Sequence, residues 1–202
     1  MLAAVLGCHI GDFPQIKATK VRAGIESRRP MGPVSAEIEI DVPRQRAFDA
    51  IADLSLRPAF TDHFLTDFHL TRIEPTGIGA GARFRIAVRP RRVWMDTTIV
   101  EAKAPHRLVE HGRGGRANRI PSVTLWELTE GPGGLTKVHV SYWTEPSNPV
   151  DRGLEVLSAG SIPYERRWRE ALRRLRELLE AGGLEEERVA VAGGNPHATG
   201  IP

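Results

Sequence analysis

A long apolar stripe near the C-terminus most constrains what this chain can fold into. Between residues 150 and 180, apolar side chains recur at intervals of three and four, as on one face of an α-helix. The stripe comprises Leu154, Leu157, Tyr164, Trp168, Leu172, Leu175 and Leu179. Asp151 can cap the start of this helix and Gly182 can end it, while Pro163 predicts a kink or a restart. Because a one-sided apolar helix needs a surface to pack on, the rest of the chain must supply one.

Short alternating segments that precede this helix predict that surface. A first strand at about 35–42 leads into two short helices at about 43–53 and 56–63. Six further strands are predicted at about 67–74, 82–89, 92–102, 107–112, 119–129 and 135–144. Glycine and proline mark the turns between them, and strands this close together are most economically joined as antiparallel hairpins. The order predicts an α+β fold in which a sheet curls around the last helix and encloses a space.

Composition sets the domain organisation. With 202 residues, of which 41% are hydrophobic, the chain fits one globular domain with loose ends. We expect disordered tails at 1–33 and 183–202 and a single domain at 34–182. Met31 stands directly before the first strand pattern, so the natural start is either Met1 or Met31.

Charge and cysteine content restrict the class of protein. The net charge of +3 is spread over both signs, so no nucleic acid partner is expected. Cys8 is the only cysteine, so a disulfide framework within one chain is excluded and a cytoplasmic location is expected. A secretory or lipoprotein leader at residues 1–7 is the alternative, although that segment lacks a basic start. No run reaches the roughly 20 apolar residues of a membrane span, so no integral membrane association is expected.

Five phrases of the sequence, taken in their order and spacing, resemble a known superfamily. They are E-I-E-I-D-V-P at 37–43, F-D-A-I-A-D at 48–53, I-E-P-T-G-I-G-A-G-A-R-F at 73–84, I-V-E-A-K-A-P-H-R-L at 99–108 and G-G-L-T-K-V at 133–138. Together they resemble the START-like, or SRPBCC, domains, which include polyketide cyclases and dehydrases, the birch pollen allergen and lipid-transfer domains. The resemblance covers about 34–182. It implies a helix-grip fold, in which a seven-stranded antiparallel sheet wraps around the long C-terminal helix with a cavity between them.

Strand alternation then predicts which side chains see that cavity. The inward set on the sheet includes Phe84, Ile86, Met95, Trp126 and Tyr142. The helix adds Tyr164 and Trp168. Such a lining suits a hydrophobic or aromatic molecule, since ligand pockets are mostly apolar with a few polar groups that fix orientation. The alternative is that these aromatic rings simply fill the core.

Polar candidates for the cavity are few. His69 is predicted to face inward, where an imidazole could act as a general acid or base. Either Glu110 or His111 faces inward, and a buried Glu110 would need Arg119 or another partner to offset its desolvation. Arg119 could equally orient an acidic group of the ligand. Asp62 and His63 are predicted to lie near the mouth of the cavity.

These patterns favour binding of a hydrophobic small molecule, such as a lipid, an aromatic or a polyketide-like compound. The alternative is an enzyme resembling polyketide cyclases and dehydrases, which uses an inward histidine or carboxylate as a general acid or base. No metal or other cofactor is expected, because the histidines are scattered and no nucleophile motif is present. Trp94 and Trp143 are predicted on the outer face of the sheet, where they would suit a homodimer or another protein partner.

Overall fold

The computed structural model describes residues 33–88, 91–114, 120–145 and 161–182. Seven antiparallel strands form one sheet in the order β1-β7-β6-β5-β4-β3-β2. The strands are β1 Val34–Ile40, β2 Leu65–Leu70, β3 Gly81–Val88, β4 Arg91–Lys103, β5 Arg107–Gly114, β6 Ile120–Glu130 and β7 Thr136–Thr144. The helices are α2 Arg44–Ala52, α3 Arg57–Thr61 and α5 Ser161–Ala181, with short 3₁₀ turns η2 Leu54–Leu56 and η4 Pro132–Gly134.

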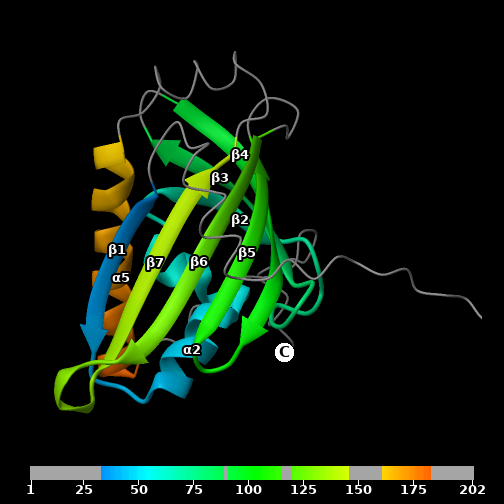
Figure 1. The fold of residues 1–202 in the computed structure, drawn as a ribbon. Helices are drawn as coiled ribbons and strands as arrows, with labels where there is room; N and C mark the ends of the chain where they lie inside the picture. Colours follow the sequence, from blue (N-terminus) through cyan, green and yellow to red (C-terminus); the bar gives the residue numbers. More distant parts are fainter. Residues whose placement is uncertain (1–32, 89–90, 115–119, 146–160, 183–202) are drawn as a thin grey trace, which may run out of the picture.

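The long helix α5 is the element on which the curled sheet closes. It runs beside β1, while α2 lies across one end of the strands (Figure 1). It packs against β1 and α3, and α2 packs against β6. The predicted helix-grip arrangement of the α+β fold is therefore confirmed.

The amphipathic pattern of α5 accounts for its position. Trp168, Leu172, Leu175 and Leu179 are all buried, as the sequence stripe predicts. Pro163 falls in the first turn of the described helix, where a missing N–H leaves no hydrogen bond unmade. The predicted kink or restart at Pro163 stays a prediction, because the residues directly before Ser161 lie outside the described part of the chain. Gly182 ends the helix in the left-handed region at φ +76°. Residues 150–160, with the predicted cap Asp151, lie outside the described residues.

Strand β2 differs from its predicted range of 67–74. It runs over Leu65–Leu70, and Ile73 lies in the connection beyond it with 81% of its surface exposed. Its pairing with β3 is also irregular. Asp67 and Phe68 together stand opposite Phe84, which makes a β-bulge, and Asp67 has φ +53°.

The core lies between the inner face of the sheet and the helices. Its largest fully buried side chains are Trp126, Phe60, Phe64, Ile40, Ile51, Leu54, Ile99, Leu108, Leu128, Leu172, Leu175 and Leu179. They come from β1, β4, β5 and β6, from α5, from the short helical segments and from the connection that follows α3. This single core holds the elements around the space that the fold leaves open.

Candidate ligand-binding cavity

A small cavity lies between the inner face of the sheet and α5. It is lined by Leu54, Arg57, Phe64, Leu65, Phe68, Phe84, Ile86, Thr97, Glu110, Thr124, Tyr142, Tyr164 and Trp168. The lining is mostly apolar, with one ion pair and two threonine hydroxyls. Its free volume of about 20 Å³ is room for about one water molecule.

Aromatic rings account for the small size of this cavity. The rings of Phe68 and Phe84 are stacked, with centroids 5.5 Å apart and an interplanar angle of 3°. Tyr142 and Tyr164 are also stacked, with centroids 6.3 Å apart. The ring of Trp168 meets Phe64 edge-on at 5.2 Å. Phe68, Phe84 and Tyr164 are only half-buried, so they are the rings that can move with the least loss of packing.

A buried ion pair forms the polar part of the wall. Arg57 is the first residue of α3, after a turn in which Asp53 accepts hydrogen bonds from the Ser55 N–H and hydroxyl at 2.9 and 2.6 Å. Glu110 lies on the inner face of β5. The Arg57 Nη2 atom donates to Glu110 Oε1 at 2.8 Å, and the two side chains are only 3% and 4% exposed.

Glu110 is well satisfied in this position. Besides Arg57, the indole N–H of Trp126 donates to its Oε1 at 2.9 Å. The hydroxyl of Thr97 donates to its Oε2 at 3.2 Å. A carboxylate this deeply buried requires such donors, because isolated burial of a charge is very costly.

Arg57 is held from several sides but keeps one unsatisfied donor. Its Nη2 atom also donates to the Ile51 carbonyl at 2.9 Å, and its guanidinium carbon lies 4.9 Å from the centre of the Trp126 ring. The buried Nε atom has no hydrogen-bond partner among the described residues. Arg57 was not predicted as a site residue from the sequence. The available signal was its place in the segment L-R-P-A-F, where an arginine stands among buried apolar positions.

The structure brings most of the predicted ligand-binding residues together. Phe84, Ile86, Glu110, Tyr142, Tyr164 and Trp168 all line the cavity. Trp126 and Met95 are buried on the same side of the sheet but do not line it, and Trp126 instead supports Glu110. Glu110 finds its partner in Arg57, whereas Arg119 lies outside the described residues.

The inward orientation predicted for His69 is wrong. His69 pairs with Arg83, whose side chain is on the outer face, and its ring meets Trp94 edge-on at 6.2 Å. Its Nδ1 atom lies 3.0 Å from the Asp67 carbonyl. The prediction grouped His69 with Ile73, but the strand ends before Ile73, and Phe68 takes the inward place.

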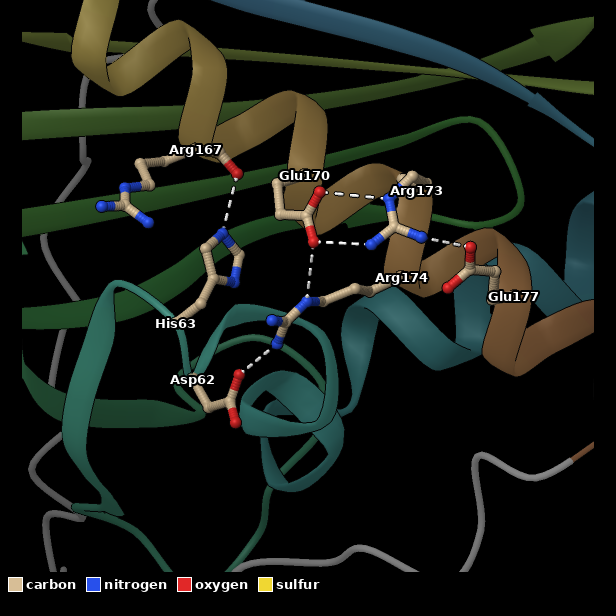
Figure 2. Close-up of polar contacts among 7 residues, drawn as sticks. All are labelled: Asp62, His63, Arg167, Glu170, Arg173, Arg174 and Glu177. Carbon is tan, nitrogen blue, oxygen red and sulfur yellow. Dashed lines mark hydrogen bonds and ion pairs between the residues drawn. The ribbon is translucent and has the colours of Figure 1, made fainter.

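His63 and Asp62 connect the end of α3 to α5 (Figure 2). The His63 Nε2 atom lies 3.1 Å from the Arg167 carbonyl, so Nε2 carries the proton. Its Nδ1 atom is buried without a partner among the described residues. Burial lowers the pKa of His63 below its usual value of 6.5, and the nearby Arg174 and Arg167 lower it further, against the Arg167 carbonyl and Glu170.

Asp62 joins a network of charged side chains on α5. Arg174 joins Asp62, at 2.5 Å, to Glu170, at 3.1 Å. Hydrogen bonds from Arg173 and Arg174 lower the pKa of Glu170 to about 2. Arg173 also pairs with Glu177 (Figure 2). Because these side chains are 33–66% exposed, their ion pairs contribute little to the stability of the fold.

The two outer tryptophans differ from each other. Trp94 is half-buried, with the guanidinium carbons of Arg83 and Arg85 at 5.2 and 4.7 Å from its ring centre. Trp143 is on the outer face, as predicted, but it is only 8% exposed. The expected exposure of Trp143 is therefore wrong, and it contributes little accessible surface.

A family model described as "Polyketide cyclase / dehydrase and lipid transport" matches residues 31–180. The chain belongs to this family. The match spans both the sheet and α5, and so it covers every cavity-lining residue described above. No curated protein is matched by sequence.

Several solved structures share the fold of this protein. The solution structure of the KanY protein has a TM-score of 0.61 and 18% identity, covering 74% of this chain and 98% of that one. The crystal structure of TTHA0849 from Thermus thermophilus has a TM-score of 0.57 and 16% identity, covering 75% and 99%. The major latex-like protein 151 from Panax ginseng has a TM-score of 0.55 and 12% identity, covering 72% and 95%. At these identities the likeness concerns the fold alone. Within the described residues, no helix is long and apolar enough to cross a membrane.

Proposed function

We propose that this protein binds a hydrophobic small molecule in the cavity between the sheet and α5. The observation that carries the proposal is an aromatic lining that contains a buried Arg57–Glu110 pair. Apolar walls with a few fixed polar groups are the usual composition of a small-molecule site. The family description, which includes lipid transport, supports a ligand of this class.

Binding requires the cavity to widen, because about 20 Å³ is too small for an organic ligand. The stacked Phe68 and Phe84 rings and the Tyr164 ring are half-buried, so their displacement costs less packing than displacement of the core. In this proposal the ligand replaces contacts that these rings now make with one another.

A direct test starts with the full chain purified from its own host. Native mass spectrometry, followed by denaturing extraction, should find a stoichiometric hydrophobic adduct. Titration with the neutral fluorescent probe N-phenyl-1-naphthylamine should show uptake by the ligand-free protein. Phe68→Ala should strengthen that uptake severalfold, since binding to the variant no longer gives up the Phe68–Phe84 stack, and an aromatic pair contributes about 0.5–1.5 kcal/mol beyond its buried area.

Trp94→Ala is the matched control. It removes a half-buried ring from the opposite face of the same sheet, so probe affinity should stay within about twofold of the wild type. A protein that takes up neither a host compound nor the probe, or that responds only to Trp94→Ala, would contradict the proposal.

An enzyme resembling polyketide cyclases and dehydrases is the second candidate. It is favoured by the fact that a carboxylate, Glu110, and a guanidinium, Arg57, both line the cavity. His69, on the outer face, cannot serve as its acid or base there. If a substrate is found, Glu110→Gln should abolish its turnover even under conditions where the variant is folded and saturated with that substrate. Equal turnover by Glu110→Gln would exclude this role.

Other predicted properties stay predictions. A homodimer through the outer face would use Trp94 and its arginine neighbours, and sedimentation of the full chain would measure it. The cytoplasmic location and the absence of a nucleic acid partner also rest on the sequence alone.

A further inference from the structure

The unsatisfied donor of Arg57 restricts the ligand more closely than the apolar lining does. Its side chain is only 3% exposed, and most side-chain polar atoms buried this deeply have at least one hydrogen-bond partner. Its Nη2 atom is used twice, by Glu110 and by the Ile51 carbonyl. The Nε atom carries a single N–H and has no acceptor among the described residues. Because Arg57 also lines the cavity, a ligand that widens the cavity could supply the acceptor that this atom lacks.

The cavity that Arg57 and Glu110 help to line has free space for one oxygen-bearing group. The cavity holds about 20 Å³, which is enough for a water molecule or a carbonyl oxygen. A ligand oxygen placed there would accept a hydrogen bond from a charged donor, and such bonds are stronger than those between neutral groups.

The charge of the wall decides which kind of oxygen fits. Glu110 lies 2.8 Å from Arg57 and already neutralises it, so the wall as a whole carries no net charge. A carboxylate ligand would be a third buried charge. It would lose its hydration and be repelled by Glu110 without an unpaired cation in compensation.

We propose that the Arg57–Glu110 pair selects an uncharged ligand with a carbonyl or hydroxyl oxygen, which accepts a hydrogen bond from Arg57 Nε, and disfavours carboxylates. This inference rests on the proposed function, since it concerns the ligand of the same cavity. Arg57 is then a specificity-determining residue, and the cavity should bind ketones, esters and phenols more tightly than fatty acid anions.

Three probes of nearly equal shape test this selectivity. They are 2-acetylnaphthalene, its hydrocarbon analogue 2-isopropenylnaphthalene and the anion 2-naphthoate, each measured by equilibrium dialysis against the full chain at pH 7.5. The ketone should bind about tenfold or more tightly than the hydrocarbon, as expected for one hydrogen bond to a charged donor. The carboxylate should bind more weakly than the ketone.

Two variants assign the effect to Arg57. In Arg57→Met/Glu110→Leu, both charges are replaced by apolar groups of similar volume, and the preference for the ketone should fall to near one. Arg57→Lys keeps a positive charge for Glu110 but has no Nε donor, so it should also lose the preference, and it serves if the double variant fails to fold. The control Arg83→Met/Asp96→Leu makes matched changes to an outer-face pair whose atoms are 3.6 Å apart, and it should keep the preference.

Each outcome decides one of the two proposals. Equal binding of the ketone and the hydrocarbon, or tightest binding of 2-naphthoate, would overturn the inference and leave the binding function standing. A ketone preference that survives in Arg57→Lys would overturn the role of Arg57. If no probe binds the wild type, the proposed function fails and the inference fails with it.

Discussion

Removing one member of the buried ion pair should destabilise the protein strongly. In Arg57→Met, Glu110 keeps its hydrogen bonds from Trp126 and Thr97 but loses its counter-charge in a place where the side chain is only 4% exposed. Breaking a buried pair in this way costs about 3–5 kcal/mol, because an uncompensated charge stays buried. For a domain of this size, that corresponds to a fall in melting temperature of roughly 6–20 °C.

Urea denaturation of the wild type, Arg57→Met, Glu110→Leu and the double variant measures this effect. The double variant should recover part of the loss, since replacing a whole buried pair by apolar groups is often close to neutral, although the Trp126 indole N–H then loses its acceptor. Lys137→Met is the control, because its pair with Glu37 at 3.0 Å is exposed and should contribute less than about 1 kcal/mol. If Arg57→Met cost no more than Lys137→Met, or if the single losses simply added in the double variant, the reasoning would be wrong.

Two further predictions concern α5 and its contact with α3. Burial is the main cause that lowers the pKa of His63, so the unfolded chain binds a proton near pH 6.5 that the folded protein excludes. Folding is therefore favoured by the neutral His63 above pH 6.5. This contribution to the free energy of unfolding is lost as the pH falls through the lowered pKa of His63 in the folded protein. The melting temperature of the wild type should therefore fall more between pH 7.5 and 5.5 than that of His63→Gln, and equal falls would contradict this assignment. Trp168→Ala should cost about 3–5 kcal/mol in urea denaturation, because its ring is 5% exposed and packs against Phe64 and Trp126. A loss no larger than that of the exposed Arg169→Ala on the same helix would show that the ring is not part of the core.

Local periodicity was enough to predict much of this fold. The inward faces of β3, β4, β6 and β7 follow from strict alternation, and the stripe of α5 follows from its helical spacing. Both patterns depend only on neighbours in sequence. The order of the elements predicted a sheet curled around the last helix, and the resemblance to a superfamily added the seven-stranded helix-grip form of that arrangement.

Features that depend on distant contacts were not predictable in the same way. Glu110 was expected to need a cation, but Arg57 is 53 residues away, and the local pattern L-R-P-A-F suggests a buried arginine without indicating its partner. His69 was placed on the wrong face because the strand ends at Leu70 and contains a bulge. The size of the cavity depends on how the aromatic rings stack on one another. Alternation along a strand predicts which face a ring lies on but not which other ring it contacts.

The bulge in β2 has a consequence for how the length of this chain can change. In a regular strand, losing one residue exchanges the two faces and would turn the cavity lining toward solvent. Asp67 is the additional residue opposite Phe84, so its deletion should leave Thr66 opposite Arg85 and His69 opposite Arg83. We expect this deletion to yield a folded protein, whereas deletion of Asp96 in the regularly paired part of β4 should not, and soluble yield with thermal melting would distinguish them. Deletion of the Asp67 codon should thus leave the inward and outward side chains of β2 on the faces that they now occupy.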